Sequence, residues 1–314
     1  MSAIQFWPPG GLEAHVFPHE PLLVAPFLPW GGIGLLHGPP GVGKSQLALT
    51  LGLAVANGTA FLVPEYTTTQ AKVLYVQADV QPRIQQERAR RAGGVPLAFL
   101  TAEMQHLDAC AIGTGAPGVR EARLWAPELV IVDTLRATHR LDEDDPATPV
   151  KVYGSWQRLF PGSTLLIVHH DRKFQLSKNG AAPSRFHHES ARGSGAWAGS
   201  ADVGLHLTDI KGRLLLSFSK VRVCGAQDPL AVRINPATLL METTELTIRQ
   251  RLVAYLAANP GASRDDATSF LTGLQTATGK PMVSKSRMHE LIADLFGALP
   301  PHRPKKSGDD KSAP

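Results

Sequence analysis

The sequence predicts an α/β fold with a mostly parallel sheet whose last strands run antiparallel, followed by a small helical domain. The first observation is the alternation of short apolar runs with helix-like runs from residue 32 onward, which is the pattern of βαβ units. The second is the segment Asp209-Ile210-Lys211-Gly212 between two late apolar runs, because its Asp and Gly suit a tight hairpin. The third is the change to helical spacing of apolar residues after residue 247.

The elements are expected in a defined order along the chain. Residues 1–28 are expected to form an irregular arm, because recurrent prolines exclude a continuous helix. The core domain over 29–240 is expected to hold strands at 33–37, 72–77, 129–132, 164–169, 203–208, 213–219 and 230–234, and helices at 46–56, 81–92 and 149–160. After a linker at 241–247, short helices are expected within 246–299, and the polar tail 300–314 is expected to be disordered.

Length and composition limit the classes of protein to which the chain can belong. Its 314 residues suggest about two domains, and 32 Lys and Arg against 27 Asp and Glu permit a nucleic-acid partner without requiring one. Cys110 and Cys224 are too few for a disulfide scaffold or a cysteine zinc site, which favours a cytoplasmic location. The proline-rich start does not suit a signal peptide, and polar residues interrupt the apolar stretch 47–63, so no membrane segment is expected.

A complete phosphate-binding loop lies between the first strand and the first helix of the expected core. Its residues are Gly38, Pro39, Pro40, Gly41, Val42, Gly43, Lys44 and Ser45. The glycines let backbone N–H groups turn toward phosphate oxygens, Lys44 can reach the β- and γ-phosphates, and the Ser45 hydroxyl can hold Mg²⁺. We therefore expect the chain to bind ATP or GTP with Mg²⁺, and no base-reading motif decides between the two nucleotides.

An acid that could lie beside the metal follows the apolar run 129–132. Asp133 ends this run, which predicts that it lies at the carboxyl edge of the sheet, where open α/β sheets bind ligands. From there it could hold Mg²⁺ directly or through a water molecule. The alternative is an ordinary aspartate that caps a turn.

Four segments of the chain resemble, in their order, a known group of ATPases. They are 38–45, 73–79, 130–136 and 166–170. The order is similar to that of RecA-like ATPases of the plasmid RepA type, which are relatives of the hexameric DnaB helicases, and the similarity spans residues 20–235. The resemblance implies a RecA-like core, ATP as the nucleotide and assembly into a homo-oligomeric ring, expected to be a hexamer.

The resemblance also implies roles for side chains beside the nucleotide. Where that family has a water-polarising glutamate, this chain has Asp79, whose shorter side chain leaves the rate of hydrolysis open. Asp79 could instead cap the following helix. His169 corresponds to a polar residue that contacts the γ-phosphate, and His170 is the second candidate for this position. A hydrogen-bonded core histidine is the alternative for each.

Two arginines are candidates to act on the nucleotide of an adjacent subunit. They are Arg192, in the segment 191–196, and Arg222, which Lys220 accompanies at the end of a late strand. A surface ion pair is the alternative for each arginine. By resemblance, the basic loop 171–189 lines the channel of a ring and contacts single-stranded DNA, with a solvated surface loop as the alternative.

The C-terminal helices resemble a winged-helix or helix-turn-helix module, which would recognise duplex DNA or a protein partner. The whole chain is interpreted as a ring-forming ATPase that couples ATP hydrolysis to translocation on DNA or to its unwinding, as a RepA-like replicative helicase does. One alternative is a RecA-like regulatory or DNA-repair ATPase without unwinding activity. Another is a DNA-binding adaptor that ATP switches.

Overall fold

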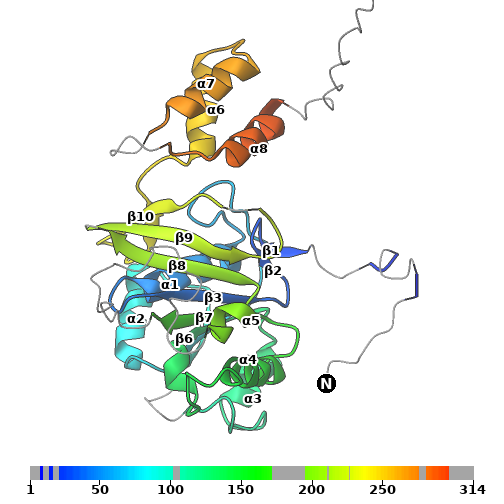
Figure 1. Cartoon of the computed structure of the whole chain (residues 1–314). Coiled ribbons are helices and arrows are strands. Elements are labelled where there is room, and N and C mark those ends of the chain that lie inside the picture. The colour runs from blue at the N-terminus through cyan, green and yellow to red at the C-terminus, as the bar shows by residue number, and fades with distance from the viewer. Residues whose placement is uncertain are drawn as a thin grey trace, which may run out of the picture. The chain divides into compact units, whose positions relative to one another are not determined.

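The chain forms two compact units, Met1–Glu245 and Leu246–Pro314, which are described here one at a time. The computed structural model describes residues 8–9, 14–16, 21–101, 107–171, 195–210, 212–225, 227–275 and 281–296 (Figure 1). Most of the basic loop 171–189, the segment around Arg192 and the tail 300–314 lie outside these residues.

A single large sheet organises the first unit (Figure 1). Its strands are, in spatial order, β11 (Met241–Thr243), β10 (Leu230–Ile234), β9 (Arg213–Val221), β8 (Val203–Ile210), β3 (Ile33–Gly38), β7 (Thr164–His170), β6 (Leu129–Asp133), β4 (Val73–Gln77) and β5 (Ala98–Thr101). Strands β8 to β5 run parallel, and β9 to β11 continue the sheet antiparallel. The prediction of a mostly parallel sheet with antiparallel last strands is confirmed.

Helices cover both faces of the parallel strands (Figure 1). They are α1 (Lys44–Asn57), α2 (Pro82–Arg91), α3 (Val119–Trp125), α4 (Thr148–Leu159) and α5 (Ala196–Ser200), with a 3₁₀ turn, η1 (Leu135–Thr138). Helix α1 is apolar on nearly all sides because it is buried, whereas α4 has one apolar side.

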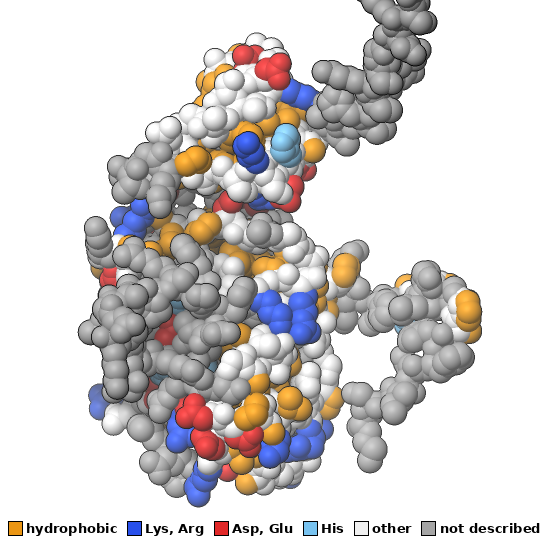
Figure 2. All heavy atoms as spheres, viewed as in Figure 1, with side chains coloured by type: hydrophobic (Ala, Val, Ile, Leu, Met, Phe, Trp, Pro, Cys, Tyr) orange, Lys and Arg blue, Asp and Glu red, His pale blue; other side chains and the backbone are white. Residues whose placement is uncertain are grey.

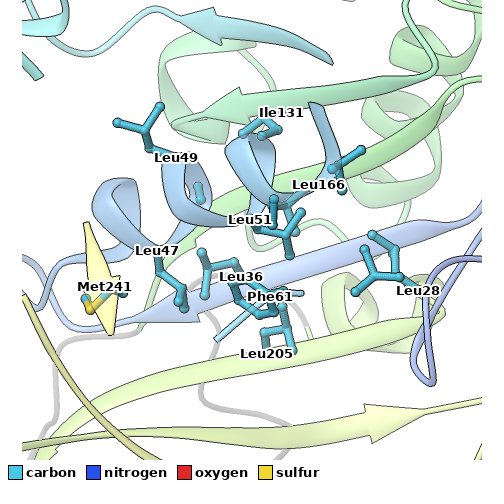
Figure 3. Close-up of a cluster of buried hydrophobic side chains, with 14 of the residues drawn as sticks. Leu28, Leu36, Leu47, Leu49, Leu51, Phe61, Ile131, Leu166, Leu205 and Met241 are labelled. Carbon is cyan, nitrogen blue, oxygen red and sulfur yellow. The ribbon is translucent and has the colours of Figure 1, made fainter. Parts of the chain in front are cut away.

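Alternate residues of the central strands supply two separate cores, because successive side chains of a strand point to opposite faces. On the face that α1 covers, Leu36 and Leu166 pack with Leu47 and Leu51 of the helix (Figure 3). On the other face, Leu35 of β3 and Ile167 of β7 pack in one core with Val152 and Trp156 of α4. Each large apolar side chain buried in this way contributes about 1.5–3 kcal/mol to stability.

The boundaries of the core differ from those expected at both ends. Residues 21–28, expected in an irregular arm, contribute to a small antiparallel pair, β1 (Leu22–Val24) with β2 (Leu28–Pro29). Phe27 is fully buried there, with its ring 5.3 Å from that of Tyr66 and 5.2 Å from that of Phe218. At the other end, part of the expected linker forms β11, because Met241 belongs to the core beside α1 (Figure 3).

The second unit consists of α6 (Ile248–Ala258), α7 (Arg264–Gly273) and α8 (Lys285–Phe296) around a core of its own. Leu252 and Leu271 are buried at its centre. Ser263 caps α7 as expected, since its hydroxyl accepts a hydrogen bond from the N–H of Asp266. The winged-helix or helix-turn-helix interpretation of this unit stays a prediction.

Among the residues that the structure describes, no helix combines the length and the apolar character needed to cross a membrane.

Candidate functional site

The phosphate-binding loop joins β3 to the start of α1, at the carboxyl edge of the sheet. Gly43, directly before α1, has a φ of 101°, a conformation that glycine adopts without strain. A Cβ atom at this position would lie only 2.7 Å from Cε of Met241. The backbone conformation therefore requires glycine at Gly43, whereas the flexible end of the Met241 side chain could move to relieve the close contact.

Lys44 is buried, and its ammonium group already has acceptors at the start of the loop and at the end of β7. Its Nζ donates to the carbonyl oxygens of Gly38 and Pro39 over 2.9 Å and 2.7 Å. It also donates to Nδ1 of His170 over 3.3 Å. Burial lowers the pKa of Lys44 to about 8, and the nearby carboxylates of Asp171, Asp133 and Asp79 oppose that decrease.

Asp133 lies where the sequence predicts, at the end of a buried strand beside the loop. The hydroxyl of Tyr75 donates to its Oδ2 over 2.7 Å, and the amide of Gln77 donates to its backbone carbonyl over 3.0 Å. Burial raises the pKa of Asp133, and the hydrogen bonds from Tyr75 and Ser45 oppose that rise.

These groups have the chemistry of a magnesium site. A hydroxyl from Ser45 and a carboxylate from Asp133 are the oxygen ligands that Mg²⁺ prefers, directly or through water. Tyr75 binds only Oδ2 of the carboxylate, which leaves Oδ1 to a metal ion or its bound water. When bound, Mg²⁺ would neutralise phosphate charge at this point.

Asp79 lies just beyond the end of β4, where it is exposed to solvent. Its charge raises the pKa values of both Asp133 and Lys44, so its carboxylate is near both groups. The structure thus brings together Lys44, Asp79 and Asp133, which sequence analysis selected separately. An exposed carboxylate at this place has access to water and to the loop.

The two histidines at the end of β7 point to opposite faces of the sheet. His170 contacts Lys44, as described above. The ring of His169 is fully buried on the other face, with its centre 5.3 Å from that of Trp197. His170, which sequence analysis placed second, is therefore the histidine of the pair beside the phosphate loop.

Arg222 and Lys220, which could act on the nucleotide of an adjacent subunit, lie away from the phosphate-binding loop of their own chain. Arg222 pairs with Asp202 over 3.1 Å, and its backbone N–H donates to the carbonyl of Asp202. Asp202 in turn accepts from the N–H of Ile33, at the start of β3, so this arginine lies at the edge of the sheet opposite the phosphate loop. Lys220 donates to the carbonyls of α5. Arg192 lies outside the described residues.

A buried cluster that sequence analysis missed lies beside the phosphate loop. Asp171 accepts from Nδ1 of His37 over 2.8 Å and from Nε2 of His206 over 2.9 Å. The two rings stack at 4.5 Å, and Nε2 of His37 lies 3.3 Å from Oγ of Ser219. Burial favours a raised pKa for Asp171, but the hydrogen bonds from His206 and His37 outweigh it and lower the pKa to about 2.

Most of the site residues that sequence analysis missed share one feature of the sequence. Tyr75, His37 and His206 are polar or partly polar side chains within otherwise apolar strand segments. Buried polar groups in such segments need hydrogen-bond partners, so they indicate contacts even where the partner is unknown.

Charged side chains are mixed on the face shown in Figure 2, where small groups of Lys and Arg alternate with Asp and Glu and with apolar side chains. This visible face thus lacks a broad basic stripe among its described residues. The expectation of single-stranded DNA as a partner stays a prediction.

Comparison with known proteins agrees with the geometry of the site. A family described as "AAA domain" matches residues 2–175, a range that contains the phosphate-binding loop, Asp79, Asp133 and His170. No curated protein matches the chain. Since the match covers more than half of the 314 residues, the chain belongs to the family of AAA-domain ATPases.

Proposed function

We propose that the protein is a Mg²⁺-dependent ATPase that forms a ring and couples ATP hydrolysis to movement on single-stranded DNA. The observation that carries the ATPase part is the arrangement around Lys44, with the buried carboxylate of Asp133 and the exposed carboxylate of Asp79 near it. In this proposal Lys44 binds the β- and γ-phosphates, and Asp133 with Ser45 holds the metal. Asp79 would orient the attacking water.

The position of His170 supports coupling between the nucleotide and the rest of the molecule. Its ring contacts Lys44 at one end of β7, directly before Asp171. A group that contacts the lysine would respond to the loss of the γ-phosphate after hydrolysis. The assembly of subunits into a ring, expected to be a hexamer, rests on the resemblance to RepA-type ATPases. The DNA partner and the unwinding of DNA rest on the same resemblance.

A second candidate is a nucleotide switch with slow turnover, which would regulate assembly or DNA binding without unwinding. The specific observation in its favour is Asp79, whose side chain is one methylene shorter than the glutamate of RepA-type ATPases. A carboxylate that holds water less well would slow hydrolysis and leave binding intact.

Steady-state ATPase activity, measured with and without single-stranded DNA over a range of protein concentrations, tests the proposal. Stimulation by DNA and a specific activity that rises with concentration are expected for a ring motor. Slow turnover that depends on neither would instead favour the nucleotide switch. In a folded Lys44→Ala variant nucleotide binding or turnover should be lost, and full activity in this variant would overturn the ATPase assignment.

A further inference from the structure

Asp171 lies beside the phosphate-binding lysine without pairing with it. The carbonyl oxygen of Gly38 accepts two hydrogen bonds, from Nζ of Lys44 over 2.9 Å and from the N–H of Asp171 over 3.1 Å. Of the carboxylates that raise the pKa of Lys44, Asp171 has the largest effect. Both residues are in the described part of the chain, and no ion pair of 4.0 Å or less joins them there.

Each carboxylate oxygen of Asp171 instead faces a histidine donor. Oδ1 faces Nδ1 of His37 and Oδ2 faces Nε2 of His206, at 2.8 Å and 2.9 Å. Since an ionised carboxylate only accepts, both of these ring nitrogens must carry a proton. The hydroxyl of Ser219 can then donate to the other nitrogen of His37, which fixes that ring in one tautomer.

We propose that His37 and His206 are positioning residues that hold both oxygens of Asp171 and so prevent this carboxylate from capturing Lys44. The lysine is then left for the phosphates of the nucleotide. This inference rests on the proposed function, because it concerns affinity for ATP. If one histidine loses its N–H, one oxygen of Asp171 loses its donor, and the nearby ammonium group becomes its best replacement partner. The carboxylate and the nucleotide would then compete for Lys44.

The cluster also has the composition of a metal site, since one donor atom from each of the three side chains lies within 4.8 Å of the others. The rings, however, are stacked at an interplanar angle of 16°, and each faces its own carboxylate oxygen. Lone pairs in nearly parallel rings point side by side and do not converge on one ion. The hydrogen-bonded arrangement explains this geometry directly.

The test is a double-mutant cycle on the full chain, with N-methylanthraniloyl-ATP and Mg²⁺ as the fluorescent probe. His206→Phe keeps the ring that stacks on His37 but removes its N–H, and it should raise the Kd of the probe about tenfold. His206→Gln keeps a donor at the same place and should stay within about threefold of the unmodified protein. In an Asp171→Asn background, His206→Phe should have much less further effect, because a neutral amide attracts the ammonium group far less strongly than a carboxylate does.

The Kd values of these variants can overturn the positioning role of His206. The inference is wrong if His206→Phe leaves the Kd unchanged, or if it raises the Kd by the same factor with and without Asp171→Asn. If His206→Phe does not fold, as judged by thermal unfolding, His37→Phe provides the same comparison at the other oxygen. His289→Ala, an exposed histidine of α8, is the matched control and should change nothing.

Two further results distinguish this inference from the proposed ATPase function and from a metal site. If the unmodified protein does not bind the probe, the proposed function fails, and the inference fails with it. Stoichiometric zinc in the purified protein, lost in His206→Phe, would make the cluster a metal site and overturn the positioning role.

Discussion

Nζ of Lys44 lies 3.3 Å from Nδ1 of His170, which joins the phosphate-binding loop to the end of β7. Because an ammonium group only donates, Nδ1 of His170 must be the acceptor, and its proton is then on Nε2. The neighbouring His169 is buried against Trp197 on the other face. This pair of adjacent histidines allows a function at the nucleotide to be separated from a function in packing.

His170→Ala should reduce kcat/KM for ATP by about tenfold or more, because hydrogen bonds to charged groups contribute about 1.5–3 kcal/mol. His169→Ala should instead lower the melting temperature, since it removes a buried ring, and should leave kcat/KM nearly unchanged in the folded protein. Both are measured by steady-state ATPase assays and thermal unfolding. The reverse pattern would show that His169 is the histidine that acts on the nucleotide.

Tyr75→Phe should lower the apparent affinity for Mg²⁺ without unfolding the protein. The change removes the hydrogen bond to Oδ2 of Asp133 and keeps the ring, whose centre lies 5.9 Å from that of Phe99. An acceptor buried without its donor costs about 1–3 kcal/mol, and an Asp133 carboxylate that is less firmly held should orient the metal less well. We expect the Mg²⁺ concentration for half-maximal activity to rise several-fold in a titration. An unchanged titration would indicate that Tyr75 serves only the packing.

Asp79→Asn should reduce turnover by about 100-fold or more if the carboxylate orients water, and should leave the Kd for nucleotide within about threefold. Asp79→Glu tests the length of the side chain and should maintain or increase turnover. Single-turnover hydrolysis with Mg²⁺-ATP separates the chemical step from binding. If Asp79→Asn and the unmodified protein hydrolyse ATP at the same rate, Asp79 is a structural residue at the end of β4.

His139 should make the stability of the first unit depend on pH. Burial, followed by the charge of Arg136, lowers the pKa of His139 to about 4 from 6.5. The unfolded chain therefore binds more protons than the folded one between these values, so this contribution is full above pH 6.5 and is lost as the pH falls toward 4. It should amount to about 1–3 kcal/mol.

Urea unfolding at pH 7.5 and at pH 5 checks the sign. His139→Leu should flatten the pH dependence of the free energy of unfolding in this range, and the exposed His289→Leu should not. A pH dependence that is equally steep in both variants would assign the effect to other groups.

Most of the core could be predicted from the sequence, because local patterns carry that information. The buried runs that became β4, β6 and β7, and the loop before Lys44, were found within a residue or two of their positions. The early pair β1 and β2 was missed, since frequent prolines suggested an irregular arm although the segment packs on Tyr66 and Phe218. Tertiary packing there outweighs local propensity.

The choice between His169 and His170 shows where such patterns stop. Both are polar residues at the end of an apolar run, and alternation guarantees only that they point to opposite faces. Leu166 and Val168 belong to the core on the side of α1, so His170 continues that side. Deciding this requires knowing which face α1 covers, and the sequence of β7 does not contain that information.

By itself the sequence determined the phosphate-binding loop, the acid at the end of β6 and the order of strands and helices, because each depends on residues that are contiguous in the chain. The tertiary structure decided that Tyr75 binds Asp133, that Arg222 lies at the edge opposite the phosphate loop, and that Asp171 meets His37. These contacts depend on the pairing of strands far apart in sequence, as the separation of 134 residues between His37 and Asp171 shows. Register across a sheet is set by the packing of the whole core, and only the folded chain reveals it.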